Sequence, residues 1–323
     1  MKMGSLLRKR IGKTAAVLVL MAALLLQPAA AVRGASLPSI VQLSSTYTYD
    51  EMIMDIAELT AMYPGIVTSG SIGTSVQGRN IPFVVLGNPA APHSIMIQSS
   101  IHAREYIVSQ STMATIEYYA MQFAAGNLAD VLATTCFYIV PMANPDGVTM
   151  AQSVAPDWKA NANGVDLNRN FPIGWELTGG PAAPGPQKFK GFTPASEPET
   201  RALMAFASAR NYSCYISYHQ QGNIIYYDDD LTSPVTSALS TALAATVNGI
   251  NRYAMVNTIT QVSTFRWPDP LFTGVVTQVS TFRWPDTLFT GVGTRELQMP
   301  QTPIGQLCAA LFLLSPVCPS VFL

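Results

Sequence analysis

Two residues in the first third of the chain have the types and the spacing of metal ligands. His102 and Glu105 lie three positions apart in the stretch His-Ala-Arg-Glu, where an apolar strand-like run gives way to a helical pattern. At such a junction both side chains can turn toward one point. Imidazole nitrogen and carboxylate oxygen both bind zinc, at about 2.0–2.2 Å. The pair therefore indicates a candidate zinc site, which for catalysis needs a third protein ligand and one open position for water.

The third ligand has to be sought elsewhere, and the chain has only three histidines. His93 follows Pro92 in a turn before a strand, where we expect a solvated loop histidine. His219 ends the apolar strand pattern Cys214–His219. A single histidine at a strand end is more often structural than ligating, so its role depends on the other motifs of the chain.

The elements that must position these residues begin with a helix. Thr48 and Glu51 form a capping-box pair, and apolar residues recur at helical spacing up to Met62, before Pro64. Further helices are expected at about 105–124, at 198–209 with Ser196 and Glu199 as a capping pair, and from Ser233 to about Ile250. Strands are expected at 81–86, 94–101, 137–142, 214–219 and 224–227. The stretch 144–193 is predicted to be a long loop with a binding or catalytic role.

Strands that alternate with helices predict an α/β fold. We expect a single domain over residues 47–323, with a mixed, largely parallel central sheet flanked by helices. In such sheets, sites collect beyond the carboxyl ends of the strands. His102 and His219 each follow directly on such a strand.

The N-terminal residues have the order of a secretory signal. A basic head is followed by the apolar run 15–26 and by small residues up to Ala31. The alternative is a membrane anchor, but the run is short for a hydrocarbon layer of about 30 Å. We therefore expect a signal peptide at 1–31, no stable anchor after cleavage, and a lead-in at 32–46 that is too short for an inhibitory prodomain.

Composition restricts the class of partner. The formal net charge is −1 and charged residues make up 11% of the chain, so no concentrated basic face for nucleic acid is expected. We expect a monomer. The four cysteines can pair in three ways. Cys308 and Cys318 are the better disulfide candidates, whereas Cys136 and Cys214 open apolar strands and are expected to be core residues.

The last third of the chain contains a repeat. Residues 260–276 recur almost unchanged as 277–293. A solenoid needs at least about three repeats, so we interpret the pair as a local tandem duplication at 260–293 inside one domain.

Five short motifs follow one another along the chain, and two of them contain the residues named above. They are IHARE at 101–105, NPDG at 144–147, WK followed by GVDLNRNF at 158–171, SYH at 217–219 and TREL at 294–297. Together, over about residues 47–297, they resemble the zinc carboxypeptidase family. The resemblance implies the fold of that family, a peptidase activity, peptide substrates and one zinc ion per chain.

The resemblance also implies roles for single residues around the zinc. His102, Glu105 and His219 would be its ligands. Asp166 would lie behind them and accept the other ring proton of His102, which fixes the tautomer. Glu296 would act as the general base on the zinc-activated water and pass the proton to the leaving amine.

The substrate would be held by polar and cationic side chains, again by resemblance. Asn168 and Arg169 would grip the terminal carboxylate, for which a planar guanidinium is suited. Arg104 would line the cleft beside the metal. Lys159 stands where many family members carry an arginine that stabilises the oxyanion, and it supplies a charge without a bidentate fork.

The sequence departs from the family pattern in its last third. No tyrosine lies between Tyr253 and Glu296, where the family carries one that covers the substrate. Of the two copies of Phe-Arg-Trp, we expect 282–284 rather than 265–267 to occupy the family position. The tail 300–323 is apolar and has two prolines at 316 and 319, which indicates an altered closing helix rather than an anchor.

Three functions remain open from the sequence. The first is a secreted carboxypeptidase that hydrolyses C-terminal peptide bonds. The second is a γ-D-glutamyl–diamino acid peptidase that acts on cell-wall stem peptides, since relatives of that kind resemble the stretch 158–172. The third is a non-catalytic relative that binds zinc. The expected location is outside a bacterial cell, in the second case associated with the cell wall.

Overall fold

The computed structural model of the chain describes residues 39–42, 44–172, 175–220, 224–227, 245, 254–257 and 275–280. The chain divides into two units, residues 1–39 and 40–323, and every element named below belongs to the second. The predicted signal peptide, the disulfide candidates, most of the duplication and Glu296 lie outside the described residues. The same holds for the helix expected from Ser233, apart from Ala245. None of the described helices is long and apolar enough to cross a membrane.

The described part of the chain contains both helices and strands. The helices are α2 (Tyr49–Met62), α3 (Ile107–Ala124), α4 (Ala129–Thr134), α5 (Pro145–Ser153) and α6 (Pro198–Ser208), with 3₁₀ turns at Ala103–Glu105 and Leu167–Arg169. The strands are β1 (Val67–Thr74), β2 (Asn80–Leu86), β3 (His93–Ser99), β4 (Thr135–Val140), β5 (Cys214–His219), β6 (Ile224–Tyr227), β7 (Ala254–Asn257) and β8 (Val275–Ser280).

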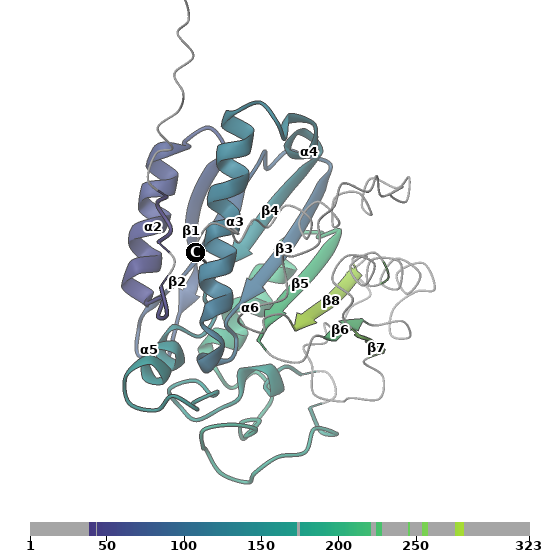
Figure 1. The fold of residues 1–323 in the computed structure, drawn as a ribbon. Coiled ribbons are helices and arrows are strands. Elements are labelled where there is room, and N and C mark those ends of the chain that lie inside the picture. The colour runs from purple at the N-terminus through teal and green to yellow at the C-terminus, as the bar shows by residue number, and fades with distance from the viewer. Residues whose placement is uncertain are drawn as a thin grey trace, which may run out of the picture. The chain divides into compact units, whose positions relative to one another are not determined.

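These strands form one mixed sheet, as expected from the sequence. Its order is β1-β2-β4-β3-β5-β8-β6-β7. The strands β4, β3, β5 and β8 run parallel to one another, whereas β1 and β2 join antiparallel on one side and β6 pairs antiparallel with β8 on the other. In Figure 1, α2 and α3 lie in front of the sheet and α6 lies behind it.

Alternate side chains of the central strands point to opposite faces of the sheet. On one face, Ile97 and Ile139 belong to a buried cluster with residues of α2 and α3. On the other face, Met96 and Tyr138 belong to a second cluster with residues of α6. All six residues of β4 are buried. The sheet is therefore covered by helices on both faces, as parallel sheets require.

The parallel strands end at one edge of the sheet. β3 and β5 are neighbours, and their register pairs Ser99 with Tyr218. His219 is the last residue of β5, and His102 follows three residues after the end of β3. The two histidines that the sequence singled out are therefore brought to the same edge.

The start of α2 follows the sequence prediction. Thr48 Oγ1 accepts a hydrogen bond from the Glu51 amide at 3.2 Å, and the Glu51 carboxylate accepts one from the Thr48 amide at 2.7 Å. The predicted capping box is confirmed.

Other local predictions are wrong. The stretch 144–193 is not loop throughout, because it contains α5. The Asn144 side chain accepts from the Gly147 amide at 3.1 Å and caps that helix, and Pro145 suits the first helical turn. At α6 the cap residue is Glu197, and Ser196 Oγ instead donates to the Glu197 carboxylate at 2.7 Å.

The strand before His102 is also shorter than predicted. It ends at Ser99, because Ser100 has a φ of 47° and the left-handed backbone leaves the sheet there. A 3₁₀ turn follows, so that α3 begins at Ile107 rather than near Glu105.

The lead-in segment is attached to α3 by a buried carboxylate. The amides of Ile40 and Val41 donate to the two oxygens of Glu117 at 2.7 and 3.0 Å, and all three residues are buried. Buried backbone N–H groups need partners. The Glu117 carboxylate accepts from both of these amides.

We predict that Glu117→Ala lowers the free energy of unfolding by about 2–4 kcal/mol, because it removes two buried hydrogen bonds to a charged acceptor and each such loss costs about 1–3 kcal/mol. The midpoint of urea unfolding measures the loss. Glu58→Ala, at an exposed position of α2, is the matched control and should shift stability by less than about 0.5 kcal/mol. Equal shifts in the two variants would contradict the role of Glu117.

Candidate metal centre

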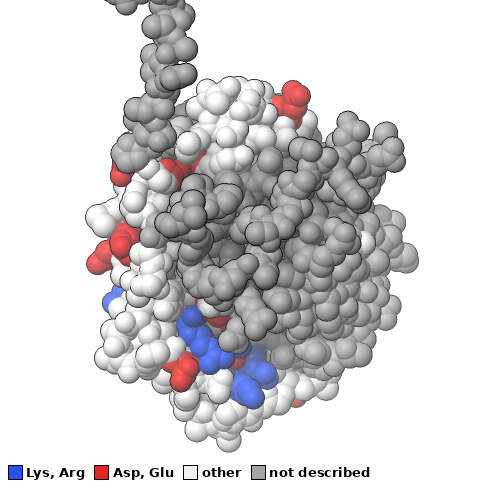
Figure 2. Space-filling model, in the orientation of Figure 1, with Lys and Arg blue, Asp and Glu red and all other residues white. Residues whose placement is uncertain are grey.

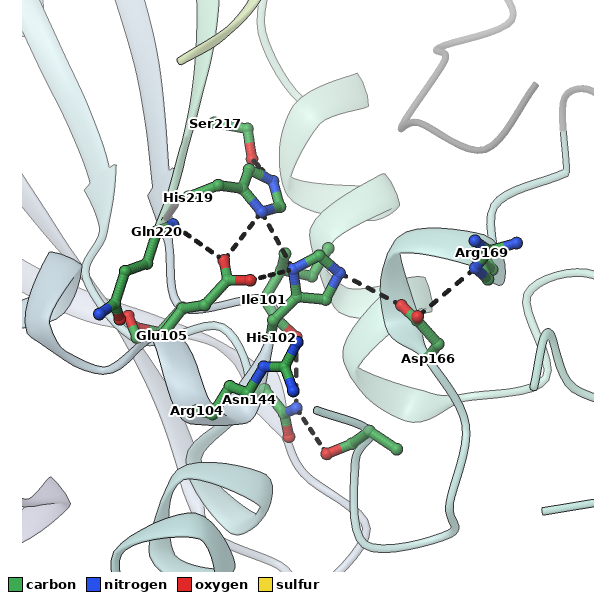
Figure 3. A network of polar contacts seen from close by, with 12 residues as sticks. Ile101, His102, Arg104, Glu105, Asn144, Asp166, Arg169, Ser217, His219 and Gln220 are labelled. Carbon is green, nitrogen blue, oxygen red and sulfur yellow. Dashed lines mark hydrogen bonds and ion pairs between the residues drawn. The ribbon is translucent and has the colours of Figure 1, made fainter. Parts of the chain in front are cut away.

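Three buried side chains converge at the edge of the sheet where β3 and β5 end (Figure 3). His102 Nδ1 lies 3.0 Å from Glu105 Oε1, and His219 Nδ1 lies 3.0 Å from Glu105 Oε2. The two Nδ1 atoms are themselves 3.0 Å apart. Among the described residues, these three form the group of histidine and acidic side chains that could hold a metal ion.

The spacing of these donor atoms fits zinc. Bonds of about 2.0–2.2 Å to a tetrahedral ion separate its ligand atoms by roughly 3.3–3.6 Å. The donors lie a few tenths of an ångström closer than that, and two imidazoles with one carboxylate are a ligand set that zinc accepts in catalytic sites. The residues present therefore fit the ion that the sequence predicted.

Hydrogen bonds to neighbouring residues stabilise the turn that carries His102 and Glu105. Ser100 Oγ donates to the Glu105 carbonyl at 3.1 Å and lies 2.6 Å from Ser109 Oγ in α3. The Gln220 amide donates to Glu105 Oε2 at 3.1 Å. These contacts turn the Glu105 carboxylate toward the end of β5.

Behind His102 lies a second carboxylate. Asp166 Oδ1 is 3.3 Å from His102 Nε2, an ion-pair contact on the side of the ring opposite to Nδ1 (Figure 3). Asp166 Oδ2 accepts from the Lys188 amide at 3.2 Å and lies 3.5 Å from Arg169 Nε. Asp166 thus stands where a proton on Nε2 would be held, which leaves Nδ1 of His102 free for a metal.

Behind His219 lies a chain of neutral groups. Ser217 Oγ is 3.1 Å from His219 Nε2 and accepts from Gln98 Nε2 at 3.2 Å. Tyr215 in turn donates to Gln98 Oε1 at 2.7 Å. The sequence reasoning missed Ser217 and Gln98. The signal was present, because Ser217 lies two positions before His219 and strand alternation puts both on one face.

The charges of the site favour the metal-binding forms of two of the three side chains, Glu105 and His219. Burial is the largest influence on the pKa of His219 and lowers it. Burial raises the pKa of Glu105, but His102 and His219 together hold it well below its usual value. Burial lowers the pKa of His102, and Glu105 and Asp166 outweigh burial, so that the net shift is upward. A metal ion binds ionised carboxylate and neutral imidazole, the forms favoured for Glu105 and His219.

Lys159 acts on this centre through its charge. Burial raises the pKa of Asp166, but His102, followed by Lys159 and Arg169, brings it below its ordinary value. Lys159 also contributes to the lowered pKa of His219. Lys159 therefore lies within electrostatic reach of both residues. In Figure 2, most of the Lys and Arg side chains visible on the described surface gather in one group, at the end toward which the β3 and β5 arrows point in Figure 1.

The residues predicted to contact the substrate differ in burial and in their hydrogen-bond partners. Asn168 is buried, and its Oδ1 has no hydrogen-bond partner among the described residues. Arg169 is half-buried, and its Nη1 donates to the Gly179 carbonyl at 2.9 Å. Arg104 points its Nη1 toward the Asp157 carbonyl at 3.4 Å. Glu296, the predicted general base, lies outside the described residues.

Comparison with protein families gives one match that covers most of the described fold. A model of the zinc carboxypeptidase family matches residues 52–263. Its range contains His102, Glu105 and His219 and ends before Glu296.

Two proteins of similar sequence, one bacterial and one from an animal, illustrate the range of relatives. Gamma-D-glutamyl-L-diamino acid endopeptidase 1 of Lysinibacillus sphaericus is 31% identical over 219 residues, which cover 59% of this chain and 54% of that protein. Carboxypeptidase A5 of Macaca fascicularis is 29% identical over 195 residues, which cover 57% of this chain and 45% of that protein. The chain thus spans about half the length of these relatives.

The solved structures agree on the fold. Carboxypeptidase A from Helicoverpa armigera superimposes with a TM-score of 0.65 at 22% identity, over 81% of this chain and 70% of that one. Thrombin activatable fibrinolysis inhibitor gives a TM-score of 0.62 at 21% identity, over 74% of this chain and 66% of that one.

We predict that Asp166→Asn weakens zinc binding by about 10- to 100-fold, because the residue behind a ligand histidine fixes its tautomer and its basicity. Titration of the purified variant with zinc against a competing chelator measures the change. Asp157→Asn, at an exposed position of the same loop, is the control and should bind zinc as the unaltered chain does. An Asp166→Asn variant with unaltered zinc affinity would refute this role.

Proposed function

Because the chain belongs to the zinc carboxypeptidase family, we propose that it is an exported zinc peptidase that removes C-terminal residues from peptides. The observation that carries the proposal is the convergence of His102, Glu105 and His219 within 3.0 Å of one another. Zinc held by these residues would polarise the scissile carbonyl and lower the pKa of a water molecule.

The residues around the metal would share the remaining work. Asp166 keeps the proton of His102 on Nε2, so that the ring stays oriented. Lys159 offers a positive charge to the oxyanion that develops on the carbonyl oxygen. Glu296 takes a proton from the attacking water and delivers it to the amine nitrogen as the peptide C–N bond breaks.

Two residues would select the end of the peptide. Asn168 is buried, and its side-chain Nδ2 would donate to the terminal carboxylate, whereas its Oδ1, which has no hydrogen-bond partner among the described residues, would accept from an N–H group of the substrate. Arg169 would pair with the same carboxylate, because its guanidinium binds carboxylates with parallel hydrogen bonds. Arg104 would contact the chain of the peptide beside the metal.

The proposed location follows from the N-terminal pattern. Cleavage after Ala31 would release the chain outside the cell without an anchor. Residues 40 and 41 are already part of the folded unit, so the segment between cleavage and fold is short.

A second substrate class has a specific observation in its favour. The relative from Lysinibacillus sphaericus, at 31% identity, is named as a gamma-D-glutamyl-L-diamino acid endopeptidase. Cell-wall stem peptides carry several carboxylates, and the cationic side chains at the site end of the sheet suit such a substrate. Stem peptides are therefore the alternative to peptides of ordinary composition.

We predict that the purified chain binds one zinc ion and cleaves blocked dipeptides with a free C-terminus. Glu296→Gln should keep the zinc and lose about 10²–10⁴-fold in kcat, because it removes the general base. Glu58→Gln, at an exposed position of α2, is the control. A γ-D-glutamyl–diaminopimelate peptide assayed in parallel decides the substrate, since cleavage of that peptide alone supports the second class. Bound zinc without cleavage of either substrate would support the non-catalytic relative.

For Arg169 we predict an effect that depends on the end group of the substrate. Arg169→Ala should raise KM for substrates with a free terminal carboxylate by about 10- to 100-fold, since a charge-assisted hydrogen bond contributes about 1.5–3 kcal/mol. Amidated analogues should change far less. Because Arg169 also lies beside Asp166, the zinc content of the variant is measured as well. Equal changes in KM for both end groups would contradict the assignment of Arg169 to the terminal carboxylate.

A further inference from the structure

Asn144 is a fully buried residue that neither the predicted chemistry nor the predicted substrate contacts use. It follows the end of β4, the strand next to β3, and it is the N-cap of α5. In Figure 3 its side chain points to the backbone of Ile101, next to the ligand His102. It opens the motif Asn-Pro-Asp-Gly at 144–147.

The side-chain amide of Asn144 makes three hydrogen bonds in a fixed orientation. Its Nδ2 donates to the carbonyl of Ile101 at 3.2 Å and to the carbonyl of Ala160 at 3.1 Å. Its Oδ1 accepts from the Gly147 amide. The reversed amide would set an oxygen against two carbonyl oxygens and a nitrogen against an N–H. Both of its hydrogens are therefore committed to the two carbonyls.

The two carbonyls belong to the two segments that must meet at the reaction centre. Ile101 directly precedes the ligand His102, and Ala160 directly follows Lys159. The Ala103 amide also donates to the Lys159 carbonyl at 3.1 Å, so the segments run side by side. Asn144 is attached to the ligand loop once more, because its own amide donates to the Ser100 carbonyl at 3.2 Å.

Gly147 lies against the Ala160 carbonyl, where a larger residue would not fit. A Cβ on Gly147 would lie 2.5 Å from the Ala160 carbonyl oxygen and 2.6 Å from the amide atoms of Asn144. Its φ is not positive, so the backbone conformation does not require glycine there. The requirement comes from the close approach of the Ala160 carbonyl to the first turn of α5.

We propose that Asn144 is a positioning residue that sets the distance between the zinc ligand His102 and the cation Lys159, by holding the carbonyls of Ile101 and Ala160. The proposal rests on the proposed function for the role of Lys159. It assigns the motif at 144–147 a task in the reaction centre, beyond capping α5.

The test separates this role from helix capping. Serine caps helices about as well as asparagine, but its side chain is too short to bridge the two carbonyls. Asn144→Ser should therefore weaken zinc binding about tenfold, the lower end of what residues behind the ligands contribute. It should also lower kcat about tenfold or more with little change in KM, because the charge of Lys159 acts in the transition state. Zinc alone, titrated against a chelator, is the probe for the first readout.

A second variant tests the same contact from the other side. Alanine in a helix is ordinarily more stable than glycine by about 0.5–1 kcal/mol. Gly147→Ala should instead lower stability, zinc affinity and kcat together, because it displaces the Ala160 carbonyl. Thr48→Ala, which removes the cap of α2, is the control for a mere loss of stability and should leave zinc affinity and kcat unchanged at 25 °C.

The outcomes are distinct from those of the proposed function. If Asn144→Ser and Gly147→Ala lose only stability, as Thr48→Ala does, and keep the zinc affinity and kcat of the unaltered chain, the positioning role is overturned. If the unaltered chain binds zinc but cleaves neither substrate, the proposed function fails. The zinc affinities of the variants then decide this inference by themselves, with a tenfold loss supporting it and equal affinity overturning it.

Discussion

The parallel pairing of β3 with β5 is the contact on which the metal centre depends. Its register sets Ser99 opposite Tyr218, so that the chain leaving β3 and the end of β5 meet at one edge. From there the left-handed turn at Ser100 brings His102 and Glu105 back toward His219. The side chains on both faces of the central strands are buried against helices. A shift of the register by one residue would turn His219 to the opposite face of the sheet.

The buried carboxylates of the site need the polar groups that surround them. A buried carboxylate without a partner is costly, and Glu105 lies between two imidazoles, with the Gln220 amide on one oxygen. Asp166 is buried beyond His102 and depends on His102, Lys159 and Arg169 for its charge. Cationic side chains and carboxylates therefore alternate from Lys159 and Arg169 through Asp166 to His102 and Glu105. A bound cation would join that alternation at the point where the three donor atoms face one another.

The parts of the structure that the sequence predicted are those with strong local signals. The capping box of α2, the apolar strands and the histidine at the end of β5 were readable, because each has a regular pattern. β1 was missed, since this edge strand is rich in Gly and Ser and has one buried residue among its eight. α5 was missed because Asn-Pro-Asp-Gly is equally a turn sequence. The contacts of Asn144 and Ser217 depend on neighbouring strands, which no local pattern contains.

The distance along the chain between the ligands has a consequence for folding. His102 and His219 are 117 positions apart, and their strands pair without a hairpin to guide them. Pairings of this kind close a long loop, which makes them slow to form. A growing chain that has reached only α6 holds two of the three ligands. A metal ion held by all three residues would therefore bind only once β5 has docked beside β3, and its binding would report that step of folding.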